Sequence, residues 1–299
     1  MEIFDFHFQN RKQQKLNCQF FFFRLVPADS CPNGQYICIY CNTYIILIVL
    51  AEKEDLMTNE IIKSLFERKS TRVFTDEEIS REEKNSILQA ALQAPSAGCQ
   101  LLYTIIDITD ADKMKKLAVL CDSQLFMAKA KMMLVFCADC RKWLSFYEEA
   151  GLKPRAPGAG DLLLAVEDAL IAAQNAVTAA ESLGIGSCYI GDVMENAEEM
   201  KTVLQLPKYV YPACLLVFGH PTEQQKLRKK PERFRVSDIV CENSYQDKNG
   251  AQMREMFAGR TDGKNYDEWM EAFWKRKYES DFSREMNRSM EVYLRDFLK

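Results

Sequence analysis

The chain has 299 residues, of which 47% are apolar and 27% charged, and 39 basic against 43 acidic residues give a formal net charge of −4. This is the composition of a globular protein long enough to bury a large core, and it excludes disordered and collagen-like chains. The charge provides no overall basic field for nucleic acid, so no nucleic-acid partner is expected and any phosphate must be recognised locally.

Residues 1–56 differ from the rest of the chain. They contain four consecutive phenylalanines, Phe20 to Phe23, and a second apolar run over residues 36–51. That run has about 16 residues, fewer than the roughly 20 that a spanning helix needs. Two interpretations stay open: a membrane anchor, or an atypical leader outside the working protein, either disordered or added by a mis-assigned start codon. The length favours the leader, and Met57 then opens the domain of residues 57–299.

From Thr58 onward the pattern predicts intermixed helices and strands. Apolar spacing predicts a helix over residues 61–66, and Thr75-Asp76-Glu77-Glu78 has the form of a capping box that opens a second helix reaching Leu92. The further predicted elements are a strand over 101–108, a helix over 112–120, a strand over 132–137, a helix over 161–183, an extended segment over 184–191, a helix over 198–204 and a strand over 213–218. The order has no regular βαβ period, which favours an α+β architecture.

Two predicted helical regions have distinctive apolar surfaces. The helix over 161–183 is apolar or small nearly all round, so we expect most of its surface to be buried, either centrally or at a subunit interface. The tail, about residues 249–299, is charged and predicted to be helical. It carries two apolar stripes that we interpret as packing surfaces, one of Trp269, Met270, Phe273, Trp274 and Tyr278 and one of Met286, Met290, Tyr293, Leu294 and Phe297.

Cysteine and histidine usage narrows the chemistry. Five of the eleven cysteines lie in apolar or small-residue contexts, where we expect reduced thiols that act as small hydrophobes in a cytoplasmic protein: Cys99, Cys121, Cys137, Cys188 and Cys214. Cys137 and Cys140 have redox-motif spacing but follow an apolar run, so we interpret them as a strand end. The two histidines, His7 and His220, argue against a hydrolase triad and against a His-rich metal site, and no metal is predicted.

Two short motifs carry most of the functional information. Residues 68–72 (RKSTR) put two guanidinium groups and two hydroxyls within one short segment, which suits a phosphate. Residues 94–100 (APSAGCQ) form a turn of small residues, where backbone can approach a flat ligand closely. Each motif alone also fits a solvated turn, so their weight comes from what accompanies them.

Together with residues 179–186 (AAESLGIG) and the basic segment 226–235 (KLRKKPERFR), these motifs resemble those of the FMN-dependent nitroreductase family in order and spacing. The resemblance covers residues 57 to about 247. Within the family, the chain is most similar to the NADPH-preferring oxygen-insensitive nitroreductases and flavin reductases. The resemblance implies an α+β fold with a central, mainly antiparallel sheet flanked by helices, in a homodimer whose C-terminal extension wraps the partner.

The resemblance also implies a binding site. Arg68, Ser70 and Arg72 would hold the phosphate and ribityl end of FMN, with Arg72 reaching toward the N1 and C2 carbonyl edge of the ring. The other implied cofactor contacts are Pro95, Ser96, Ala97, Gly98, Gln100, Gln124, Ile190, Gly191, Lys230 and Arg233. Arg228 and Lys229 are candidates for the 2′-phosphate of NADPH. The sequence departs from the family pattern twice, because Glu232 separates Pro231 from Arg233 and Cys99 stands where Asn or Ser is common.

The implied activity is an FMN-dependent NAD(P)H oxidoreductase. Hydride would pass from NADPH or NADH to the flavin N5, and an electron-poor small molecule, such as a nitroaromatic, a quinone or free flavin, would then take two electrons in a ping-pong cycle. No residue is a certain catalytic group, and Arg72 and Lys230 are candidates to stabilise charge on the ring. The alternatives are a flavin reductase or another specialised enzyme of the same fold, and, from another class, a non-catalytic flavin-binding or membrane-tethered protein.

Overall fold

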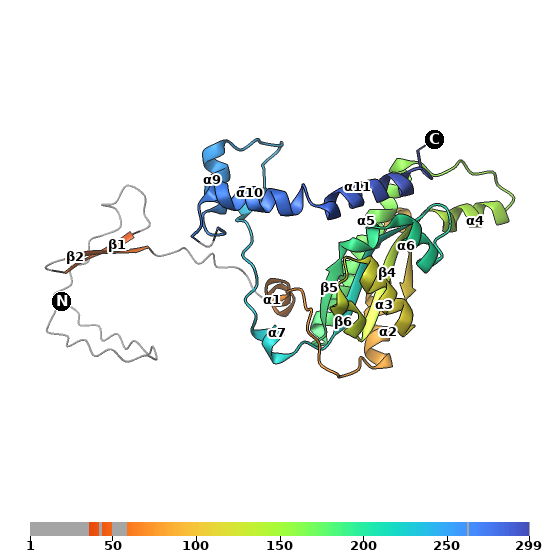
Figure 1. The fold of residues 1–299 in the computed structure, drawn as a ribbon, viewed down its shortest axis with the longest axis horizontal. Coiled ribbons are helices and arrows are strands. Elements are labelled where there is room, and N and C mark those ends of the chain that lie inside the picture. Colours follow the sequence, from red (N-terminus) through yellow and green to blue (C-terminus); the bar gives the residue numbers. More distant parts are fainter. Residues whose placement is uncertain (1–35, 42–43, 50–58, 262, 299) are drawn as a thin grey trace. The chain divides into compact units, whose positions relative to one another are not determined.

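The computed structural model describes residues 36–41, 44–49, 59–261 and 263–298, and the chain divides into two units, residues 1–58 and 59–299 (Figure 1). In the first unit, strands β1 (Tyr36–Cys41) and β2 (Tyr44–Val49) pair in antiparallel fashion, with Tyr36 opposite Val49. The apolar run weighed above as a membrane anchor therefore contains two strands and not one helix. The phenylalanine run lies outside the described residues.

The second unit is built on a four-stranded antiparallel sheet with the strand order β3-β4-β6-β5. Its strands are β3 (Tyr103–Asp107), β4 (Met132–Asp139), β5 (Gly186–Ile190) and β6 (Val210–Gly219). Every residue of the two central strands is buried, which requires that both faces of the sheet be covered. The expected α+β class and antiparallel sheet are confirmed.

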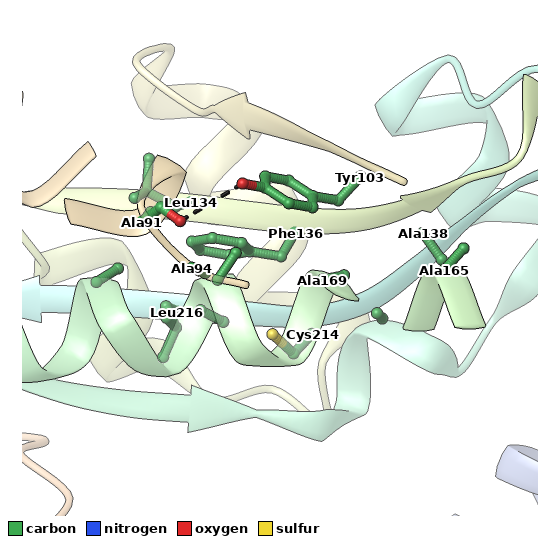
Figure 2. Packing of buried hydrophobic residues seen from close by; sticks show 14 of the residues in the cluster. Ala91, Ala94, Tyr103, Leu134, Phe136, Ala138, Ala165, Ala169, Cys214 and Leu216 are labelled. Atoms are coloured by element: carbon green, nitrogen blue, oxygen red, sulfur yellow. Dashed lines mark hydrogen bonds between the residues drawn. The ribbon is translucent and has the colours of Figure 1, made fainter. Parts of the chain in front are cut away.

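Helices cover the two faces of this sheet (Figure 1). On one face, α5 (Ala159–Ser182) and α2 (Arg81–Leu92) pack against alternate residues of the central strands, such as Phe136 and Leu216. On the other face, α3 (Ala111–Leu120) and α6 (Ala197–Leu204) pack against the intervening residues, such as Val135 and Leu215. Figure 2 shows the first layer, in which Ala165 and Ala169 of α5 lie close to the strands.

Helix α5 is buried on one side only. Six alanines on its buried side are fully inaccessible, and their small side chains let the helix approach the sheet closely: Ala165, Ala169, Ala172, Ala173, Ala176 and Ala180. Of the two alternatives expected for this helix, central burial of most of its surface is wrong, because Leu163, Leu164, Leu170 and Ile171 are 39 to 63% exposed, and burial at a subunit interface stays a prediction. In the described part of the chain, α5 is also the one helix long and apolar enough to cross a membrane by length and composition, a property shared with core helices of soluble proteins.

The second helix starts later than the sequence suggested. Helix α2 begins at Arg81, because the capping box is formed by Ser80 and Glu83: the Ser80 Oγ accepts from the Glu83 N–H at 3.2 Å, and the Glu83 carboxylate accepts from the Ser80 N–H at 2.8 Å. The predicted box at Thr75 is therefore wrong. The Thr75 N–H instead donates to the His220 carbonyl at 2.8 Å, which ties residues 74–75 to the end of β6.

The remaining described helices and turns connect or extend this unit. They are α1 (Glu60–Glu67), η2 (Ala97–Cys99), η3 (Leu125–Lys129), α4 (Arg141–Glu149), η4 (Gly191–Met194), α7 (Glu223–Leu227), α8 (Val236–Ile239), α9 (Gly250–Phe257), α10 (Tyr266–Lys277) and α11 (Asp281–Leu294). The two tail stripes differ in burial. Tyr293 and Phe297 of the second stripe join the core. In the first stripe Trp269 packs against Phe257 and Phe273, whereas Trp274 and Tyr278 are exposed.

Most of the thiols behave as expected. Cys121, Cys137, Cys188 and Cys214 are free and buried, and burial raises the pKa of each thiol, to about 12 for Cys137. The strand-end interpretation of Cys137 and Cys140 is confirmed, because β4 ends at Asp139 and both thiols are free. The prediction of a buried, hydrophobic thiol is wrong for Cys99. Its thiol is exposed, since it lies in the turn after α2.

Candidate functional site

The RKSTR segment lies as an extended chain beside β5. Ser70 pairs with Ser187 in parallel fashion, and the Thr71 N–H donates to the Ser187 carbonyl at 2.9 Å. Gly186 is required here, because a Cβ at this position would lie 2.3 Å from the Thr71 hydroxyl oxygen. Since extended backbone alternates its side chains, Arg68, Ser70 and Arg72 are directed to one side and Thr71 to the other.

Gln225 of α7 fixes the backbone of the same segment. Its side chain is 3% exposed, its Nε2 donates to the Ser70 carbonyl and its Oε1 accepts from the Arg72 N–H, each at 3.3 Å. The sequence reasoning did not find Gln225, and its position just before the basic segment was the available signal. Lys69 adds a second tie, because its Nζ donates to the carbonyls of Lys226 and Arg228.

Three cations converge at the end of α1. The Arg68 guanidinium reaches Ser187 Oγ at 3.5 Å and lies 5.8 Å from the centre of the Tyr189 ring, while its Nε is buried without a hydrogen-bond partner. The Lys230 Nζ donates to the Leu65 and Phe66 carbonyls at 3.1 and 2.6 Å. Burial lowers the pKa of Lys230, and the nearby charges of Arg233 and Arg68 lower it further.

No carboxylate within the described residues forms an ion pair with Arg68, Lys230 or Arg233. Glu181 of α5 is near, but burial raises the pKa of its carboxyl group even though Arg68, Lys69 and Lys230 act in the opposite direction. A cluster of like charges with an unpartnered guanidinium nitrogen fits a bound phosphate. The residues present therefore suit the phosphate end of FMN.

Further predicted residues lie along the same edge of the unit. The Arg72 guanidinium is 6.0 Å from the centre of the Phe126 ring in η3, directly after Gln124. Ile190 is buried at the end of β5, and Gly191, which opens η4, is exposed with no heavy atom within 4 Å of its Cβ position. The structure thus brings Arg72 close to the segment that carries Gln124.

The 94–100 turn is held by a residue that the sequence analysis missed. Asp168 of α5 accepts from the Ala97 N–H at 2.9 Å and from the Leu102 N–H at 3.0 Å. Around it, Ser96 Oγ accepts from the Leu101 N–H, and the Trp143 indole donates to the Gln100 carbonyl at 2.8 Å. Pro95 and Gly98 are exposed. The available signal was a pair of acidic residues, Glu167 and Asp168, inside a largely apolar stretch of helix, although the sequence does not show which of the two is buried.

The predicted contacts fall into two groups along α5. The turn is bonded to Asp168, whereas the cation cluster lies near Glu181 on the same helix. At 1.5 Å per residue, these two positions are about 20 Å apart along α5. The candidate NADPH contacts also lie at the cation end: Arg228 and Lys229 are exposed, and the Lys229 Nζ is 3.4 Å from a Glu232 carboxylate oxygen.

Comparison with known proteins identifies the family of this chain. The chain belongs to the Nitroreductase family, whose family model matches residues 65–220. It is 33% identical over 234 residues to an FMN reductase (NAD(P)H) of Bacillus subtilis, which covers 74% of this chain and 93% of the relative. It is 38% identical over 185 residues to an oxygen-insensitive NADPH nitroreductase of Salmonella typhimurium, which covers 62% of this chain and 74% of the relative.

A solved structure of a related enzyme has a similar fold. The NADPH:FMN oxidoreductase from Vibrio harveyi, complexed with NAD+, superposes with a TM-score of 0.64 at 27% identity, over 80% of this chain and 99% of that structure. The expected family and the nitroreductase-like fold are therefore confirmed.

Proposed function

We propose that this protein is an FMN-dependent NAD(P)H oxidoreductase of the nitroreductase type, acting on nitroaromatics, quinones or flavins. The observation that carries the proposal is the cluster of Arg68, Lys230 and Arg233 without an ion-paired carboxylate in the described part of the chain, with the Arg68 Nε buried and unpartnered. The chain belongs to a family whose relatives are named as FMN reductases and an NADPH nitroreductase. This supports FMN as the anion that binds at the cluster.

Each group of residues then has a separate task. FMN, when bound, supplies the redox chemistry, taking hydride from a nicotinamide and passing two electrons to an acceptor. Arg68, Lys230 and Arg233 bind the phosphate, and Ser70 supports the ribityl chain. Arg72, beside Phe126, places positive charge at the ring edge where negative charge develops, which favours hydride uptake in a partly dry site. The ring itself is lined by Pro95, Ser96, Ala97, Gly98, Gln100, Gln124, Ile190 and Gly191.

The site is completed by a second copy of the chain. Because the turn and the cation cluster are about 20 Å apart along α5, the ring bound at one copy's cations meets the turn of the partner subunit. Two apolar surfaces support a homodimer: the exposed leucines and isoleucine of α5, and Ile61, Leu65 and Phe66 of α1, which are 49 to 65% exposed. The exposed aromatic side chains of α10 fit a C-terminal extension that wraps the partner.

Basic residues indicate the electron donor, and cysteines indicate the cellular compartment. Arg228 and Lys229 bind the 2′-phosphate of NADPH, because both are exposed cations next to Lys230 of the cation cluster. The seven cysteines from Cys99 to Cys241 in the described part of the chain are free, which supports a cytoplasmic protein. The catalytic unit starts near Met57, and residues 1–56 are a leader to it.

The test is the visible spectrum of the purified full-length chain. We expect a flavin spectrum, or its appearance on adding FMN, then bleaching by NADPH without oxygen and recovery on adding a quinone or nitroaromatic. A colourless protein that FMN does not reconstitute would overturn the proposal. Flavin that binds but is bleached by neither NADPH nor NADH would leave a non-catalytic flavin-binding protein instead.

A further inference from the structure

Asp168 is a carboxylate placed where an apolar residue would be expected. It lies on the buried side of α5 at 3% exposure, and Ala165 and Ala172, the neighbours one turn away, are fully buried. A carboxylate in such surroundings costs free energy unless its oxygens are hydrogen-bonded. Both oxygens accept one bond each, from the Ala97 and Leu102 N–H groups, and no cation pairs with the side chain anywhere in the described ranges.

The backbone between these two donors is unfavourable by itself. Gly98, Cys99 and Leu101 have φ angles of 57°, 58° and 48°, and only the first is glycine. Left-handed backbone costs conformational energy for residues with a side chain, so the turn needs support from outside. Trp143 binds one carbonyl in the middle of the turn, whereas Asp168 binds the N–H group at each end.

Resting on the proposed function, we infer that Asp168 is the positioning residue that holds residues 97–102 in the shape that receives the flavin ring. It acts through Ala97 and Leu102 and does not touch the cofactor. The ionised carboxylate is required, because two N–H donors converge on one side chain and an amide offers them a single acceptor oxygen. Since the turn faces the ring and not the phosphate, Asp168 supports binding of phosphorylated and unphosphorylated flavins equally.

The test is Asp168→Asn in the full-length chain. The substitution keeps the size of the side chain but turns an NH2 group toward one of the two N–H donors. We expect the dissociation constants of both FMN and riboflavin to rise by about tenfold or more, in equal proportion. The visible circular dichroism of the bound flavin changes as well, and kcat falls by more than the KM for NADPH rises, because the ring is misplaced in the bound state.

Glu285→Gln is the control variant. It makes the same carboxylate-to-amide change at a residue that joins α11 to the start of α6, accepting from the Asn196 N–H at 3.1 Å and from Ser289 Oγ at 2.8 Å. We expect a lower melting temperature without a change in flavin affinity or circular dichroism. A loss of general stability is thereby separated from a loss of turn geometry.

Three outcomes would count against the inference. Folded Asp168→Asn protein with wild-type affinities and circular dichroism would overturn it, and so would a loss confined to FMN. If Asp168→Asn does not fold, Asp168→Glu carries the test, because it keeps two acceptor oxygens on a longer side chain. Its flavin affinity should lie below that of the wild type, and an unchanged value would overturn the inference. Wild-type protein that binds neither flavin would remove the proposed function itself.

Discussion

Near the middle of α5, Asp168 satisfies two backbone N–H groups of a turn, whereas near the end of the same helix Arg68 and Lys230 have no ion-paired carboxylate among the described residues. The first region fixes its own shape before any ligand arrives. The second region carries positive charge without an ion-paired carboxylate in the described part of the chain, and a bound anion would neutralise that charge. Shape and charge are thus prepared separately, about 20 Å apart along one helix, and under the proposed function two copies of the chain bring them together in one site.

Subunit complementation tests whether the turn and the cations of one site come from different chains, and it should give the largest effect. Arg68→Met removes a phosphate contact, and Gly98→Val puts a β-branched residue at a φ of 57°, so each variant alone should be inactive without added FMN. When the two are co-expressed, each mixed dimer has one site with both changes and one with neither. About one quarter of the sites should therefore recover activity.

The control is the mass of the mixed species in a native mass spectrum. Mixed dimers that form but recover no activity would place the turn and the cations of one site in the same chain. The separation of the two regions along α5 would then be bridged within one subunit.

A large effect is expected on flavin selectivity at the cation end. Arg68→Met should weaken FMN binding by about tenfold to a hundredfold, because a charge-assisted contact to phosphate is lost. Riboflavin, which has no phosphate, should bind with unchanged affinity, in contrast to Asp168→Asn. Fluorescence titration of apoprotein with both flavins measures the ratio.

Lys63→Met is the matched control for this substitution. It removes the same charge from the exposed side of α1 and should leave both affinities unchanged. Equal losses for FMN and riboflavin in Arg68→Met would contradict a phosphate role.

The smallest effect concerns pH and Lys230. Burial and the charges of Arg233 and Arg68 lower the pKa of Lys230 from 10.5 in the folded protein, and a bound phosphate raises it again. FMN should therefore bind with its highest affinity at pH values below the lowered pKa of Lys230, where the ammonium group is charged, and the affinity should fall as the pH rises through that pKa. The FMN phosphate loses its second proton near pH 6, so between about pH 7 and 10 its own charge stays constant.

Lys230→Arg should remove this pH dependence, because arginine stays charged throughout that range. Riboflavin affinity provides the internal reference and should be flat with pH in both proteins. A wild-type FMN affinity with the same pH profile as that of Lys230→Arg would exclude Lys230 from the phosphate site.

Much of the local structure was determined by the sequence itself. The strands β3, β4, β5 and β6, the helices α3 and α5, and the two motifs were predictable because hydrophobic periodicity, glycines and basic clusters act over a few neighbouring residues. The family was recognisable from four short segments in order, and the family comparison confirmed it.

The tertiary structure decided what depends on distant partners. Thr75 was a plausible cap by sequence, but its N–H pairs with His220 and the cap moved to Ser80. Asp168 stands beside Glu167 as one of two acidic residues in an apolar helix, and only the fold brings it to Ala97, 71 positions earlier in the chain. Gln225 likewise meets Ser70 across 155 positions. Such contacts depend on which faces the sheet brings together, and residue patterns within one segment carry no information about the face of another.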